Sequence, residues 1–77
     1  METIGNRIKR LRRSNHIKAA ELARMIGASP ISVCNWEAGR HRPSPGMISK
    51  LSEVLEVSPR YIKYGEEPYG RTNQTTP

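Results

Sequence analysis

Phenylalanine and aspartate do not occur among the 77 residues, and cysteine and tryptophan occur once each. The single cysteine, Cys34, excludes an internal disulfide and suits a reducing cytoplasm. No apolar run approaches the roughly 18 residues of a membrane span, and Met1 is not followed by a signal-peptide pattern. We therefore expect one small domain with a modest core of Ile, Leu, Val and Met around Trp36.

The charge of the chain is strongly one-sided. Thirteen Lys and Arg residues outnumber seven acidic residues, all Glu, which gives a formal net charge of +6. This balance favours a polyanionic partner, either nucleic acid or an anionic membrane surface, although a basic domain without such a partner would have the same composition. No Asp–Glu pair for acid–base catalysis and no glycine-rich phosphate loop is present, so no enzyme activity is expected.

Apolar residues at helical spacing predict the first helix between Thr3, which suits an N-cap, and about Ser14. Asn15 and His16 end this helix, with Asn15 suited to the left-handed conformation. Lys18 then stands in the cap position of a second helix. Lysine is a poor cap, so this residue is either a tolerated surface lysine or one that reaches a phosphate.

Three Ser-Pro pairs predict the starts of three further helices, because Ser can cap and Pro fits the first helical position. The pairs are Ser29-Pro30, Ser44-Pro45 and Ser58-Pro59. Gly65 closes the last helix, in which Tyr61 is expected to be a core residue. The domain therefore covers residues 1–65, and the polar residues 66–77 are expected to form a flexible tail.

The stretch around Gly27 has the spacing of a helix-turn-helix. Leu22 and Ile26 lie four residues apart before this glycine, and Val33 and Trp36 lie three apart after it, so each short helix turns one apolar face inward. Gly27 suits a turn that needs a positive φ. The second of these helices is then left with a free outer face. That face carries Ile31, Cys34, Asn35 and Ala38, with Ser32 beside them.

The chain carries, in this order, the segments RIKRLR, ELARMIGAS, VCNWEAGRHRP and LSEVLEVSPRYIKYG. Together they resemble the lambda-repressor-like (Cro/repressor, or Xre-type) DNA-binding domains over about residues 4–65. The resemblance implies an all-α fold of five helices, with the helix-turn-helix formed by helices two and three. It also implies that helix three enters the DNA major groove while helix two crosses the backbone.

The resemblance also implies residue roles. Ile31 would meet a thymine methyl group and Asn35 an adenine edge, although each can instead be an ordinary exposed helix residue. Arg12 and Glu37 would form a half-buried ion pair linking helices one and three. The base contacts expected are Pro30, Ile31, Ser32 and Asn35. The phosphate contacts expected are Lys18, Ser29, Arg40, His41 and Arg42.

Two differences separate this chain from the family pattern. Similar proteins often carry Thr-Gln where this chain has Lys18-Ala19, and glutamines where it has Pro30 and Ile31. The docking mode survives because backbone amides and lysine still meet phosphate. The base-reading code of the relatives does not carry over, so the sequence of the DNA target is not predicted.

The function implied is a sequence-specific, double-stranded DNA-binding transcription regulator of the cytoplasm and nucleoid. It would be a phage- or prokaryote-type repressor that binds a palindromic operator as a homodimer, through a surface around Val57–Tyr64. The alternative is a protein-interaction module such as an antitoxin or coactivator-like subunit. No cofactor, small-molecule substrate or membrane partner is expected, and His16, His41 and Cys34 match no metal-site spacing.

Overall fold

The computed structural model describes residues 2–65, so the tail predicted for residues 66–77 lies outside the described part. Residues 2–65 form helices and no strand, which confirms the all-α, five-helix prediction. No helix among them is long and apolar enough to cross a membrane. The helices are α1 (Ile4–Ser14), α2 (Ala19–Ile26), α3 (Pro30–Ala38), α4 (Pro45–Leu55) and α5 (Pro59–Tyr64).

All three predicted Ser-Pro starts are confirmed. Ser29, Ser44 and Ser58 take extended backbone angles, and each hydroxyl oxygen accepts a hydrogen bond from the amide three residues later. These distances are 3.1, 3.2 and 3.0 Å. Thr3 caps α1 in the same way, at 3.0 Å from the Asn6 amide. Local capping chemistry therefore sets where four of the helices begin.

Glycines in the left-handed conformation end three of the helices, with φ of 74° at Gly27, 83° at Gly39 and 74° at Gly65. The prediction that Asn15 takes this conformation is wrong. Asn15 has φ of −94°, and its side-chain amide donates to the Leu11 carbonyl at 2.8 Å, which extends the helical turn. The left-handed turn consequently falls one residue later, at His16, where φ is 57°.

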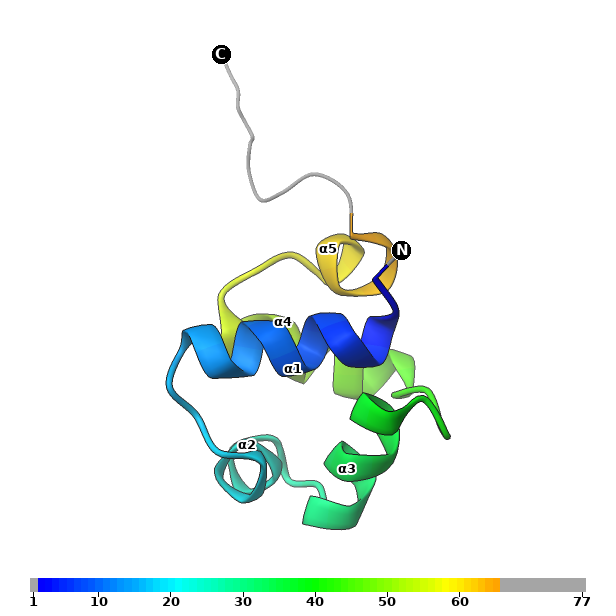
Figure 1. Cartoon of the computed structure of the whole chain (residues 1–77). Helices are drawn as coiled ribbons and strands as arrows, with labels where there is room; N and C mark the ends of the chain where they lie inside the picture. Colours follow the sequence, from blue (N-terminus) through cyan, green and yellow to red (C-terminus); the bar gives the residue numbers. More distant parts are fainter. Residues whose placement is uncertain (1, 66–77) are drawn as a thin grey trace.

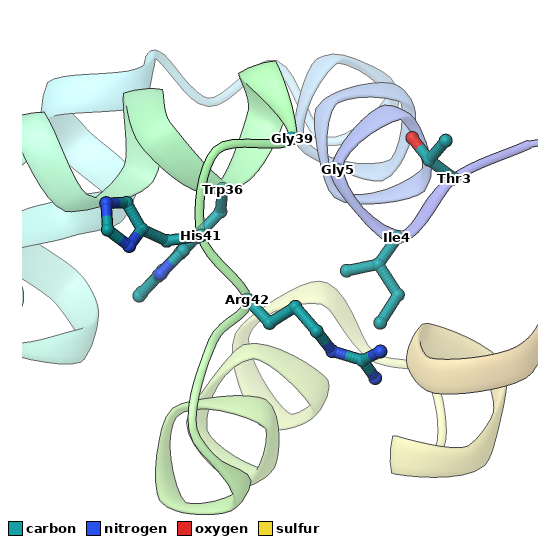
Figure 2. A pocket seen from close by; sticks show the side chains of 7 residues that line it. All are labelled: Thr3, Ile4, Gly5, Trp36, Gly39, His41 and Arg42. Atoms are coloured by element: carbon teal, nitrogen blue, oxygen red, sulfur yellow. The ribbon is translucent and has the colours of Figure 1, made fainter.

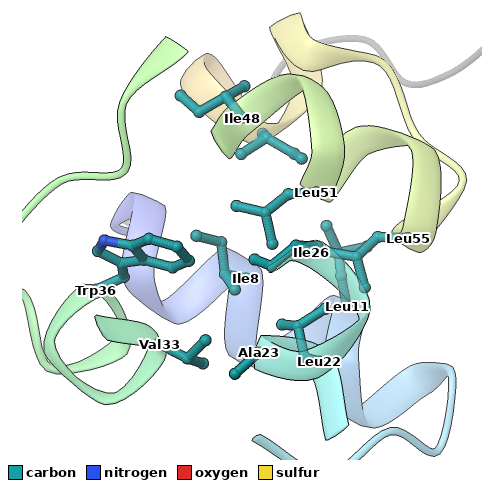
Figure 3. Close-up of a cluster of buried hydrophobic side chains, with 11 residues drawn as sticks. Ile8, Leu11, Leu22, Ala23, Ile26, Val33, Trp36, Ile48, Leu51 and Leu55 are labelled. Carbon is teal, nitrogen blue, oxygen red and sulfur yellow. The ribbon is translucent and has the colours of Figure 1, made fainter. Parts of the chain in front are cut away.

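One apolar core joins the helices. Figure 1 shows α1 crossing the middle of the molecule, with α2 and α3 on one side and α5 on the other. The expected use of Met in this core is only partly confirmed for the methionines described, because Met47 is partly buried and packs against the core whereas Met25 is 55% exposed. Figure 3 shows the cluster, which contains Ile8, Leu11, Leu22, Ala23, Ile26, Val33, Trp36, Ile48, Leu51, Leu55 and Ile62.

Gly5 allows α1 to pack directly on the end of α3. A Cβ atom at this position would overlap the Trp36 carbonyl oxygen and would lie 2.9 Å from the Glu37 carbonyl oxygen. Those groups are backbone atoms and cannot rotate away as a side chain can. The absence of a side chain at Gly5 therefore sets how α3 is presented by the rest of the domain.

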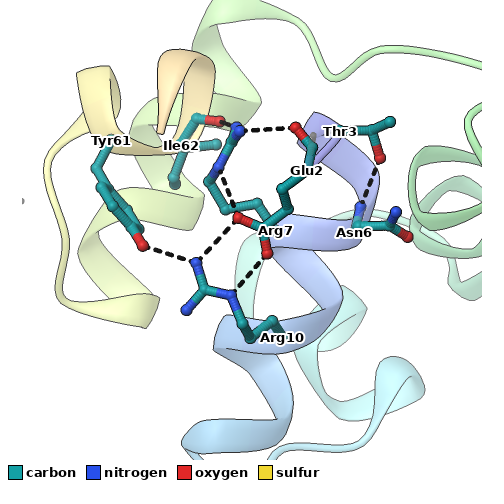
Figure 4. Close-up of polar contacts among 7 residues, drawn as sticks. All are labelled: Glu2, Thr3, Asn6, Arg7, Arg10, Tyr61 and Ile62. Atoms are coloured by element: carbon teal, nitrogen blue, oxygen red, sulfur yellow. Dashed lines mark hydrogen bonds and ion pairs between the residues drawn. The ribbon is translucent and has the colours of Figure 1, made fainter. Parts of the chain in front are cut away.

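A polar cluster ties α5 to the start of α1 (Figure 4). Arg7 is buried, and it donates to the Ile62 carbonyl at 2.6 Å and to the Glu2 carbonyl at 3.0 Å. Arg10 donates to the Glu2 carboxylate at 2.6 Å, and this bond holds the pKa of Glu2 below its ordinary value. Arg10 also donates to the hydroxyl of Tyr61 at 2.6 Å.

These contacts correct the expectation for Tyr61 and show the role of Arg7. Tyr61 is half-buried at the edge of the core instead of inside it, because its hydroxyl needs a polar partner and finds one in Arg10. Arg7 is committed to the Ile62 carbonyl near the end of α5 and is not an exposed cation. The cations of α1 therefore do not form one continuous basic surface.

Candidate nucleic-acid interface

Helix α3 turns one face to the core and one to solvent, as its spacing predicts. Val33 is fully buried and Trp36 is 7% exposed. On the opposite side Ile31 is 71% exposed, and Cys34 is exposed as well. Asn35 is half-buried between the two faces. The outer face of α3 is therefore open to solvent and accessible to a partner.

The outer face of α3 is also uncharged. The helix has one acidic or basic side chain, Glu37, and the ion pair predicted between Glu37 and Arg12 is present. Arg12 Nε lies 2.7 Å from one carboxylate oxygen and Nη2 lies 3.1 Å from the other. Each side chain is 11% exposed, and the bond to Glu37 raises the pKa of Arg12. The negative charge nearest the outer face is therefore neutralised.

Arg12 also fixes the start of the helix-turn-helix. Its Nη1 donates to the Ile17 carbonyl at 2.8 Å, just before α2 begins. One guanidinium thus joins α1, the α1–α2 connection and α3. The orientation of α3 against α1 and α2 depends on this group as well as on the apolar core.

The loop after α3 is held on the helix by two backbone hydrogen bonds. With Gly39 left-handed, its amide donates to the Trp36 carbonyl at 3.1 Å, and the Arg40 amide donates to the Asn35 carbonyl at 2.9 Å. This is a Schellman motif, the common C-terminal cap of helices. Residues 40–42 therefore start from a fixed point on α3, directly beside a predicted base-reading residue.

The predicted base and phosphate residues meet around a hollow of about 310 Å³ between α3 and this loop. Ser32 and Asn35 line it from the helix, and His41 and Arg42 from the loop. A second hollow, of about 230 Å³, lies between the loop and the start of α1 and includes Ile4 (Figure 2). Figure 2 shows His41 and Arg42 extending to different sides of the loop, and both residues line each of the two hollows.

The remaining predicted contacts lie at the starts of α2 and α3. Lys18, Ser29 and Pro30 are exposed. Glu21 accepts from the Lys18 amide at 3.2 Å, but a lysine ammonium has no lone pair to return the bond, so only half of a capping box exists. The Lys18 side chain makes no capping hydrogen bond and is available to an external partner.

One contact was not foreseen from the sequence. Arg40 Nη1 lies 3.4 Å from Asn35 Oδ1, so the guanidinium rests on the outer side of α3. The sequence does contain a feature from which this contact could be predicted. Gly39, four residues after Asn35, indicates a Schellman motif, and this motif brings Arg40 next to Asn35. By contrast, nothing in the local sequence indicates that Arg7 would be buried.

The family model for helix-turn-helix domains matches residues 8–62 of this chain. Among curated proteins, the chain is 37% identical over 65 residues to the HTH-type transcriptional regulator DicA of Escherichia coli K12. It is 31% identical over 65 residues to repressor protein C2 of Salmonella phage P22. Each alignment covers 84% of this chain but only 48% of DicA and 30% of C2, so the chain spans less than half the length of either relative.

Solved structures have the same fold. The P22 c2 repressor in complex with synthetic operator 9T matches with a TM-score of 0.82 and 30% identity, covering 86% of this chain and 100% of that chain. SinR, the master regulator for biofilm formation, in complex with DNA, matches with a TM-score of 0.74 and 31% identity, covering 78% and 97% of the two chains. The predicted lambda-repressor-like fold is confirmed.

Proposed function

Because this chain belongs to the helix-turn-helix family, we propose that it is a sequence-specific, double-stranded DNA-binding transcription regulator. It acts as a repressor that places α3 in the major groove of a palindromic operator. The observation that carries the proposal is the outer face of α3, which is exposed, uncharged and bordered by the cationic loop of residues 40–42. The relatives that are named as regulators and repressors support it.

The dimensions of α3 support major-groove binding. An α-helix with its side chains is roughly 10–12 Å across, which fits the roughly 12 Å width of the major groove, and the 9 residues of α3 give it about two and a half turns to lie in that groove. Ser29 caps its start, His41 and Arg42 follow its end, and Lys18 lies at the start of the preceding helix, α2. Donors at both ends of the helix suit contacts with the phosphates on the two sides of the groove.

Base contacts come from the outer face between these donors. Ile31 meets a thymine methyl group, and Asn35 offers an amide to a base edge. Pro30 and Ser32 lie at the start of α3, the part of a recognition helix that enters the groove most deeply. The ion pair of Arg12 with Glu37 holds this face in position without touching DNA.

Residues 1–65 form the DNA-binding domain, and two copies of it bind one operator in the cytoplasm. One α3 reads one half-site, so a palindrome with half-sites about 34 Å apart needs a dimer. The dimer surface lies around Val57–Tyr64, where Tyr64 is 62% exposed and Val57 is half-buried. No catalytic step and no cofactor enter this function.

Selection of bound duplexes from a random pool, followed by titrations across salt, tests the function. We expect the selected duplex to bind at least about 10³-fold more tightly than random duplex, with affinity falling steeply as salt rises. Weak binding that ignores sequence would contradict the proposal. It would favour the alternative of a protein-interaction module such as an antitoxin or coactivator-like subunit.

Asn35→Ala and Arg42→Ala separate base reading from phosphate binding. Asn35→Ala is expected to relax the preference at one base pair of each half-site by about 1–3 kcal/mol. Arg42→Ala should weaken binding to all duplexes alike and reduce the salt slope by about 0.9 for each phosphate that is no longer neutralised. Titrations of single-base-pair duplex variants measure both effects. Identical profiles for the two variants would refute this division of roles.

Lys18→Ser tests why a poor cap occupies the start of α2. Serine should accept the hydrogen bond that lysine cannot, and raise the free energy of unfolding by about 1 kcal/mol in urea titrations. If lysine is there for phosphate, the same variant should bind every duplex more weakly. Higher stability with unchanged DNA affinity would identify Lys18 as a tolerated surface residue.

A further inference from the structure

We propose that Arg40 reads a base, and that together with Asn35 it selects a guanine in each half-site; this rests on the proposed function. It replaces the phosphate role that the sequence suggested for Arg40. The starting observation is the position of the Arg40 guanidinium, 3.4 Å from Asn35 Oδ1 on the outer side of α3. A base-reading residue and an arginine are therefore adjacent before any DNA is bound.

Backbone hydrogen bonds hold the main chain of Arg40 next to Asn35. The Arg40 amide is bonded to the Asn35 carbonyl at 2.9 Å, and the His41 amide lies 3.4 Å from the same oxygen. Asn35 itself lies one turn after Ile31 on the same side of the helix. The Arg40 side chain thus leaves the main chain at the edge of the base-reading face, where its length allows it to reach across that face.

No other cation of the helix or its loop is placed for this task. Helix α3 contains no Lys or Arg, and its Glu37 is occupied by Arg12. Arg40 forms no ion pair with any carboxylate within residues 2–65, so its guanidinium is available. Arg42, the next cation of the loop, lines the hollow beyond Asn35 together with His41, and both residues are placed for the DNA backbone.

The donor pattern determines which base is read. Reading adenine with both atoms of the Asn35 amide uses Oδ1 as an acceptor, and one lone pair of that oxygen already faces the Arg40 guanidinium. Arg40 itself carries only N–H donors and no acceptor. The two side chains together therefore present N–H donors. Guanine offers two acceptors in the major groove, O6 and N7, whereas adenine offers one acceptor and one donor. The pair consequently favours guanine over adenine.

Single-base-pair variants of the selected duplex test this with the wild-type chain, Arg40→Ala and the matched control Arg42→Ala. We expect wild type to prefer guanine at one position of each half-site by about tenfold or more. Arg40→Ala should lose that preference and retain the others. Arg42→Ala should retain the whole pattern while binding more weakly. Thermal unfolding of Arg40→Ala should match wild type, because Arg40 is exposed.

Duplexes carrying 7-deazaguanine at the preferred position provide an independent readout, since this base lacks the N7 acceptor. The substitution should weaken wild-type binding by about tenfold and should leave Arg40→Ala unaffected. If Arg40→Ala weakens all duplexes equally and keeps the guanine preference, Arg40 binds phosphate and the inference is overturned while the proposed function stands. If wild type selects no sequence at all, both fail.

Discussion

Gly5→Ala is expected to lower the melting temperature by about 15 °C or more. The added methyl group would overlap the Trp36 carbonyl oxygen, and α1 would have to move away from α3. Forcing an atom against packed backbone costs about 3 kcal/mol, and a domain of this length is stable by only about 4–12 kcal/mol. For so small a domain each kcal/mol corresponds to about 4–8 °C.

Gly46→Ala is the matched control. Gly46 lies in the first turn of α4, where a Cβ would meet only the Ser44 hydroxyl oxygen at 3.9 Å. Alanine there should stabilise the chain by about 0.5–1 kcal/mol, because glycine loses more backbone entropy on folding. Thermal unfolding followed by circular dichroism compares the two variants. If the Gly5→Ala protein had the same melting temperature as wild type, α1 and α3 would not approach each other so closely.

Glu37→Ala is expected to lower the free energy of unfolding by about 2–3 kcal/mol. Removing one partner of a buried ion pair costs about 3–5 kcal/mol, and a pair that is 11% exposed on each side should lie below that range. Arg12→Ala should cost at least as much, because the Ile17 carbonyl then also loses its donor. The double variant should lose less than the sum of the two single variants.

Urea titrations of the four proteins in this cycle measure the coupling. Arg13→Ala is the control, because Arg13 is the next residue on α1 but is exposed, and its removal should change stability by less than about 0.5 kcal/mol. Additive effects of Arg12→Ala and Glu37→Ala would mean that the two groups do not stabilise each other. Because the pair orients α3, we expect both single variants to weaken DNA binding as well.

The fold could be predicted where short segments determine it. Ser29, Ser44 and Ser58 each carry both the capping hydroxyl and the following proline, and Gly27 and Gly65 each stop a helix. The inward positions of Val33 and Trp36 follow from their spacing alone. The end of α1 shows the limit, because the Asn15 side chain bonds the Leu11 carbonyl and the left-handed turn moves to His16.

Contacts between distant segments could not be predicted in this way. Nothing in the sequence around Gly5 distinguishes it from other positions in α1. A glycine is needed there only because the Trp36 carbonyl packs against it. Arg7 sits in a basic stretch, and its burial depends on the Ile62 carbonyl 55 residues later. The candidate site was easier, because its residues lie on one helix and the adjoining loop. Even there, the contact between Arg40 and Asn35 was not predicted, and it is the reason why we propose that Arg40 reads a base and does not bind phosphate.

The placement of α3 in the major groove is tested most directly by a nuclear magnetic resonance titration with the selected duplex. The chain is labelled at the methyl groups of its seven isoleucines. We predict that the Ile31 methyl signals shift strongly and show contacts to a base methyl group. Ile8, which is fully buried on the core side of α1 and lies outside both the proposed DNA-binding face and the proposed dimer surface, should hardly change. Unchanged Ile31 signals at saturating duplex would contradict the placement of α3 in the major groove.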